Sequence, residues 1–259
     1  MSRSTDDIRR GASAELAQGI RGDHDFGDLS VEFQINQGAA ELPTLVFVEC
    51  HAVETPAPWR RNSFLETQPF TRIFINDPTV RAHPDTAQGW GVGSASTSGI
   101  SAILDLVHKL DGVASEKRIY IGSGGDGYTA LYLAIVDEAG AVAVSNPDLG
   151  WHHAPGPAAM TLLDRFPIDI LRERRLDILT IPVGSRRPII DAAANSANPQ
   201  FAERIIPPLI TLVSSTESPA DPRRSRVAIY RDEQRPTAPL APSEFETRVL
   251  ELTRVLSEQ

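Results

Sequence analysis

A β-rich segment, a turn crowded with glycine and an apolar helical segment follow one another without a break between Arg118 and Ala134. The turn reads Gly-Ser-Gly-Gly-Asp-Gly, so four of its six residues lack a side chain. A chain can pass this abruptly from strand to helix only where side chains do not obstruct the return of the helix onto the strand. Such strand–helix units build parallel sheets that are covered by helices. The run therefore predicts an α/β protein with a mostly parallel central sheet.

The rest of the chain alternates between short β-rich runs and apolar residues at helical spacing, without an internal repeat. The final helix carries a capping-box pattern, with Ser243 at its N-cap and Glu246 three residues later. We expect a flexible polar arm over residues 1–28, a single domain over residues 29–259, and a cap-like region over about residues 149–207. The predicted strands are 31–35, 44–48, 72–75, 118–121, 141–145, 178–183, 209–213 and 227–230, and the main helices are 98–110, 128–136 and 243–256.

Composition narrows the functions that such a domain can have. The 259 residues carry a formal net charge of −9, which argues against nucleic acid or an anionic membrane as the main partner. Cys50 is the only cysteine, which excludes an intrachain disulfide and a cysteine-based zinc site. No stretch approaches the ~18 apolar residues of a membrane helix. We expect a cytoplasmic protein without a membrane span, a bound metal or a cofactor.

Several short motifs occur in a characteristic order. Residues 120–128 read Tyr-Ile-Gly-Ser-Gly-Gly-Asp-Gly-Tyr, with Asp77-Pro-Thr79 and Gly89-Trp90 before them and Ser145-Asn-Pro-Asp148 after them. This series resembles α/β-hydrolase-like proteins of bacterial surface-polysaccharide biosynthesis and glycan modification, over roughly residues 40–150. The resemblance implies a three-layer α/β-hydrolase-like fold with a cap-like insertion. It also implies a carbohydrate or acyl-sugar ligand, or a protein partner in glycan biosynthesis.

Three departures from that family concern its catalytic groups. Gly124 stands where the family's turn carries its reactive serine, and Glu49-Cys-His51 replaces a His-Gly pair that contributes to the oxyanion hole. No histidine follows His153, although the family's catalytic base lies near the C-terminus. Glu217, the candidate for the acid, then has no histidine to orient. Because a catalytic triad acts as a unit, we predict a catalytically degenerate member that binds a ligand or a partner.

Two other interpretations stay open. Ser123, one position before Gly124, could serve an active esterase or acyltransferase with His152 or His153 as the base. The plainer roles for these residues are a turn hydroxyl and a surface histidine pair. Gly122, Gly124 and Gly127 also form a G-x-G-x-x-G sequence, which predicts a dinucleotide-binding loop with Asp148 on the ribose, although such a loop usually opens its domain.

Candidate ligand-binding residues surround the glycine turn, because α/β sheets bind ligands at the carboxyl ends of their strands. Some of them also have a structural interpretation: Glu49 and His51 as a buried pair, and Trp90 as a cover for the core. The candidates are Glu49, His51, Trp90, Gly122, Gly124 and Asp126.

Overall fold

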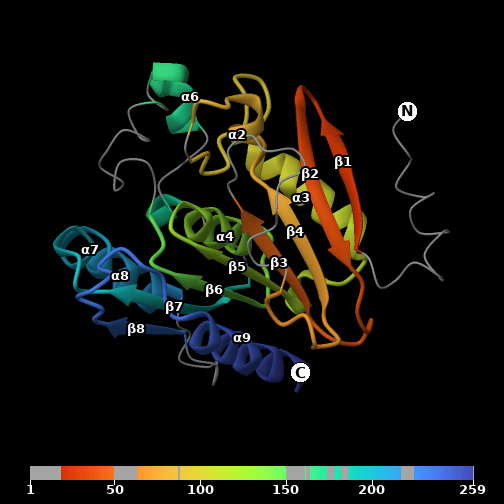
Figure 1. Cartoon of the computed structure of the whole chain (residues 1–259). Coiled ribbons are helices and arrows are strands. Elements are labelled where there is room, and N and C mark those ends of the chain that lie inside the picture. Colours follow the sequence, from red (N-terminus) through yellow and green to blue (C-terminus); the bar gives the residue numbers. More distant parts are fainter. Residues whose placement is uncertain are drawn as a thin grey trace.

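An open sheet of eight strands forms the centre of the protein, and helices cover both of its faces (Figure 1). The computed structural model describes residues 19–49, 63–86, 88–149, 161, 164–173, 178–181, 186–216 and 225–258. The strand order is β1-β2-β4-β3-β5-β6-β7-β8; the β1–β2 and β2–β4 pairs are antiparallel, and all pairs from β4 to β8 are parallel. The strands are β1 (Ile20–Phe26), β2 (Leu29–Asn36), β3 (Thr44–Glu49), β4 (Thr71–Asn76), β5 (Arg118–Ser123), β6 (Ala141–Ser145), β7 (Ile189–Asn195) and β8 (Arg226–Tyr230).

Alternate residues of the central strands face two separate apolar cores, which is why these strands are apolar throughout. Val46 and Val48 of β3 pack with α3, α4 and α8 on one face. Leu45 and Phe47 pack with α9 on the other. The predicted three-layer α/β fold with a mostly parallel sheet is thereby confirmed. The helices are α2 (Pro78–Ala82), α3 (Gly99–Asp111), η1 (Ser115–Lys117), α4 (Gly125–Val136), α6 (Ile168–Glu173), η2 (Ile178–Thr180), α7 (Pro199–Arg204), α8 (Ile206–Thr216) and α9 (Pro242–Ser257).

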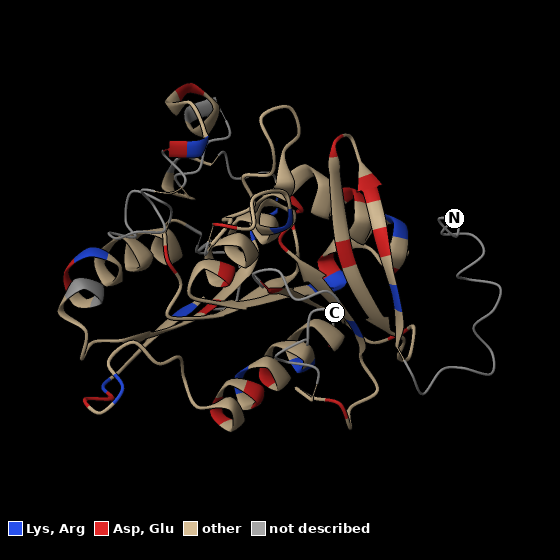
Figure 2. Cartoon of the chain, turned by 45° about the horizontal axis from the view of Figure 1, so that its top comes forward, with Lys and Arg blue, Asp and Glu red and all other residues tan. Residues whose placement is uncertain are grey.

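The predicted arm over residues 1–28 is too long. Residues 20–26 form β1, which pairs with residues 29–35 of β2 at one edge of the sheet. Two contacts hold this strand to the body: His24 Nε2 lies 2.7 Å from Asp105 Oδ2 of α3, and Arg81 of α2 pairs with Asp23. Asp and Glu residues are prominent on the β1–β2 ribbon (Figure 2). The polar composition that suggested an arm is that of an edge strand whose outer residues meet solvent.

The predicted cap over residues 149–207 is also wrong in extent, because its last third belongs to the body. Residues 189–195 form β7 between β6 and β8. The sequence of this strand is rich in alanine and contains Asp191, both unfavourable in strands. Asp191 is buried but accepts hydrogen bonds from Arg226 and Arg248, which compensates its charge.

Three local predictions also fail. Residues 209–213, predicted as a strand, lie inside helix α8. A short apolar run cannot by itself distinguish a strand from a buried helix segment. Residues 178–180, also predicted as a strand, form a 3₁₀ turn. Helix α9 begins at Pro242 after Ala241, without a side-chain cap, so the Ser243 capping box does not form.

Candidate functional site

The chain turns from β5 into α4 at Gly124, in a conformation that other residues rarely adopt. Its φ is 58° and its ψ is −130°, a combination that strains any residue with a Cβ atom. The turn is tight on both sides: a Cβ on Gly122 would lie 2.3 Å from the Asp126 carbonyl oxygen, and one on Gly127 would lie 3.0 Å from Pro147. A Cβ on Gly124, in contrast, would have no atom of the other described residues within 4 Å, its two chain neighbours apart. Among the described residues, nothing therefore obstructs a side chain at position 124, at the carboxyl edge of the sheet.

Backbone hydrogen bonds fix this turn against the segment that follows β6. The Gly124 N–H donates to the carbonyl oxygens of Ser145 and Asn146, at 3.2 and 3.0 Å. The Asp148 N–H in turn donates to the Gly124 carbonyl oxygen at 2.9 Å. The Ser145-Asn-Pro-Asp148 motif therefore supports the glycine turn directly.

Asn146 connects the same turn to the ends of β7 and β8. It is buried and has a positive φ of 46°. Its Oδ1 accepts from the Asn195 N–H at 2.7 Å, and its Nδ2 donates to the Ala238 carbonyl oxygen at 2.6 Å. The Asn195 side chain continues the network, accepting from the N–H of Asp232 and donating to the carbonyl oxygen of Arg235. The sequence motif identified Asn146 as part of a turn, but nothing in the sequence pointed to Asn195.

Asp148 is the residue near the turn whose acidity is most altered. Burial raises its pKa to about 6, with a second contribution from the negative charge of Asp126, while the Trp90 indole opposes the shift. The Trp90 N–H makes no well-formed hydrogen bond within the described part of the chain. Asp126 itself lies in the first turn of α4 and is partly exposed.

The Asp77-Pro-Thr79 motif stabilises the loop that contains Trp90. Asp77 caps α2 by accepting from the Thr79 N–H, and its second oxygen accepts from the Gly91 N–H at 2.7 Å. The Thr79 hydroxyl accepts from the Gly93 N–H at 2.7 Å. These bonds hold the loop that places Trp90 in the core, with none of its surface exposed. Trp90 therefore covers the core and does not line a surface cleft.

The other predicted site residues are only partly described. Glu49 is buried at the end of β3, and its carbonyl oxygen accepts from the Asp77 N–H at 2.9 Å. His51, His152, His153 and Glu217 lie outside the described residues. The three described histidines serve elsewhere: His24 and His108 contact Asp105 and Asp137, and His83 packs edge-on against Phe166.

In this strand order, the acid and the base of a catalytic triad would follow β7 and β8. The assignment of Glu217 as the acid requires residues 209–213 to form the preceding strand, and they are helical. The segment after β7 reads Ser-Ala-Asn-Pro-Gln over residues 196–200, and the segment after β8 reads Arg-Asp-Glu-Gln-Arg-Pro-Thr-Ala-Pro over residues 231–239. Neither contains a histidine, and Asn195 and Asn146 tie the two segments together.

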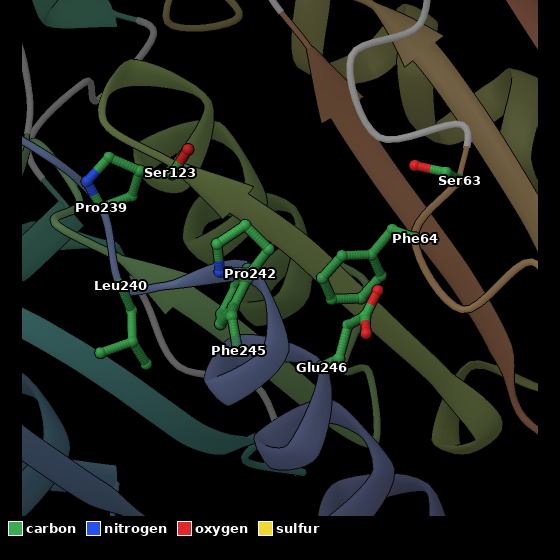
Figure 3. Close-up of a pocket in the computed structure, with 8 residues that line it drawn as sticks. All are labelled: Ser63, Phe64, Ser123, Pro239, Leu240, Pro242, Phe245 and Glu246. Atoms are coloured by element: carbon green, nitrogen blue, oxygen red, sulfur yellow. The ribbon is translucent and has the colours of Figure 1, made fainter.

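Ser123 borders a pocket on the α9 side of β5 (Figure 3). The pocket has a volume of about 210 Å³. Ser123 is the last residue of β5 and is partly exposed. Apolar walls come from the loop before α9, from the start of α9 and from the segment around Phe64. Sequence reasoning missed Phe64, Leu240 and Phe245, because an apolar residue that lines a pocket has the same pattern as one that fills a core.

No protein-family model and no curated protein sequence matches the chain. Solved structures do match. The capsule O-acetyltransferase of Neisseria meningitidis serogroup A superposes with a TM-score of 0.60 at 9% identity, over 89% of this chain and 96% of that one. Mouse alpha/beta hydrolase domain-containing protein 10 gives 0.61 at 13% identity, over 92% and 99%.

A third similar structure is the Glycosylation Associate Protein (Gap123) complex from Streptococcus agalactiae. Its TM-score is 0.57 at 12% identity, over 92% of this chain and 46% of that one. At such identities the likeness concerns the fold alone. Together with the strand order and the glycine turn after β5, these matches show that the chain has the α/β-hydrolase fold.

Proposed function

We propose that this protein is a binding member of the α/β-hydrolase fold that has no serine-hydrolase activity. The observation that carries the proposal is Gly124, which has the positive φ of a nucleophile position and no obstruction from the other described residues, but no side chain. Without an oxygen or sulfur atom at that point, no covalent acyl-enzyme can form there.

The missing base supports the same conclusion. The segment after β8, where the fold places its catalytic histidine, has none. Its backbone is instead bonded to Asn195, whose position at the end of β7 adjoins that of the acid. Nucleophile and base are thus absent from the two segments that should supply them.

We propose that the ligand or partner belongs to the assembly or modification of bacterial surface glycans, in the cytoplasm. The similarity to a capsule O-acetyltransferase favours an acyl-sugar ligand, and the similarity to a glycosylation-associated complex favours a protein partner. The motifs at residues 77–79, 89–90, 120–128 and 145–148 support the same group of proteins.

The rival is an active esterase or acyltransferase with Ser123 as its nucleophile and His152 or His153 as its base. The position of Ser123 at the border of a pocket favours it. However, Ser123 precedes the strained position and belongs to the regular ladder of β5, where it pairs with Ser145. The dinucleotide alternative has less support, since Gly122, Gly124 and Gly127 serve the tight turn itself.

Labelling with a fluorophosphonate, read by intact mass, separates the two classes. We expect no adduct on the wild-type protein, on Ser123→Ala or on Gly124→Ser, because the turn offers no base for a serine. A stoichiometric adduct on the wild type that is lost in Ser123→Ala would establish the rival. An adduct with rapid ester turnover in Gly124→Ser alone would show that a base is present after all, and that only the nucleophile was lost.

A further inference from the structure

The pocket beside Ser123 has the size for one small chemical group. A volume of about 210 Å³ corresponds to roughly seven water molecules at ~30 Å³ each. Pockets for drug-sized ligands occupy about 300–1,000 Å³. The pocket therefore suits part of a ligand, with the remainder lying outside it.

Its walls are apolar and preformed. Phe64, Leu240 and Phe245 are each only 6% exposed, and the rings of Phe64 and Phe245 pack edge to face at 5.7 Å. The Leu240 N–H donates to Ser145 Oγ at 2.7 Å, and the Ala238 carbonyl oxygen accepts from Asn146 and Tyr230. The loop that forms one wall is thus fixed by the same network that supports the glycine turn. A fixed apolar wall favours a hydrocarbon group, because little ordering is needed on binding.

The polar atoms at its border narrow the ligand class further. The Ser63 hydroxyl at the exposed rim can donate to a carbonyl oxygen, which a plain hydrocarbon would not supply. Glu246 is the only charged residue among the described ones that line the pocket, and its Oε1 accepts from the Leu65 N–H at 3.3 Å. A carboxylate or phosphate in the pocket would be repelled by this negative charge.

We infer that the pocket binds the short acyl chain of an uncharged amide or ester, of about four to six carbons, with its carbonyl towards the Ser63 hydroxyl. The rest of the ligand would then lie outside the pocket. This inference deepens the proposed binding function and rests on it for the identity of that remainder, a sugar.

Calorimetric titration with two series of amides tests this. The first series is N-acetyl-, N-butanoyl-, N-hexanoyl- and N-decanoylglucosamine, and the second carries the same acyl groups on ethanolamine. Affinity should rise about fourfold per added methylene up to hexanoyl, since a buried methylene contributes ~0.8 kcal/mol and 1.4 kcal/mol is tenfold. It should then level off at decanoyl. Free hexanoate should bind at least tenfold more weakly than the hexanoyl amides, and Glu246→Gln should reduce that difference.

Two variants locate the binding. Ser63→Trp at the exposed rim should block it, while Ser101→Trp on the exposed surface of α3 should not. Flat affinity along both series, equal binding of hexanoate, tighter binding of benzoyl amides, or full binding by Ser63→Trp would each overturn the acyl assignment. Equal binding of the two series, with the chain-length dependence intact, would retain the acyl pocket and contradict the glycan proposal.

Discussion

Gly124 has the backbone conformation that in α/β-hydrolases presents a nucleophilic side chain, but it carries no side chain itself. Its φ of 58° is accessible to glycine without strain. What maintains it is the close approach of Gly122 to the backbone of Asp126, together with the bonds from residues 145–148. The turn is thus required for α4 to pack on β5, whatever residue stands at its apex. The fold therefore keeps this turn without a side chain at position 124.

Burial of the Asp148 carboxyl group at this turn destabilises the folded protein at neutral pH. Its pKa of about 6 in the folded protein lies above the ordinary value of 3.8. The unfolded chain therefore releases this proton at lower pH than the folded one, and stability falls as pH rises from about 4 to about 6. Above that range the penalty is constant, with a ceiling of about 3 kcal/mol for a shift of roughly two units.

Asp148→Asn should remove this penalty. We expect the variant to be more stable than the wild type by about 1–2 kcal/mol at pH 7.5 and by less than about 0.5 kcal/mol at pH 4. Urea unfolding at several pH values measures both differences. The backbone bond from residue 148 to Gly124 is unchanged by the substitution, so an equal effect at both pH values would place the stabilisation elsewhere than in the carboxyl group.

At the level of the elements, the ends of β6, β7 and β8 are joined through one side chain. Asn146 has a positive φ that asparagine and glycine tolerate, and it makes two buried hydrogen bonds. Asn146→Gly should lose the bonds alone and destabilise the protein by about 2–3 kcal/mol. Asn146→Ala should lose about 1 kcal/mol more, from the unfavourable φ.

Chemical denaturation of both variants measures the two contributions. Asp232 provides no such junction through its side chain, which among the described residues bonds only to Gln234 and Arg235 of its own loop. Asp232→Ala is therefore a control expected to stay within about 1 kcal/mol of the wild type. If Asn146→Gly unfolds no more easily than this control, the loops are held by other contacts.

The same elements show how far sequence reasoning reaches. The central strands β3, β5 and β6 and helices α3 and α4 were predicted within a few residues, because their apolar runs are continuous and their turns are marked by glycine or asparagine. Strand β7 was missed because it is alanine-rich and carries Asp191, whose compensating arginines lie 35 and 57 residues away. Gly124 lies at the apex of the turn between β5 and α4, as the sequence indicated, whereas the choice of Glu217 as the acid depended on a strand at residues 209–213, which are helical.

For the molecule as a whole, the sheet is open and has two edges, β1 and β8. Arg residues are interspersed with Glu residues along α9 (Figure 2). No helix in the described ranges is both long enough and apolar enough to cross a bilayer. Because residues 20–26 form strand β1 of the sheet, the predicted arm can include at most residues 1–18.

Two N-terminal truncations test that boundary. Deletion of residues 1–18 leaves β1 intact and should keep the melting temperature within about 2 °C of the full chain. Deletion of residues 1–28 removes β1 and the hydrogen bonds of Asp28 to Ser94 and Ser96, and it exposes the edge of β2. A loss of about 3 kcal/mol there corresponds to a melting temperature lower by roughly 6–12 °C, with aggregation through the exposed edge. If both truncations melt alike at the lower temperature, residues 1–18 belong to the folded body. If both melt like the full chain, β1 contributes nothing to stability, and the domain starts at β2 as residues 29–259 first suggested.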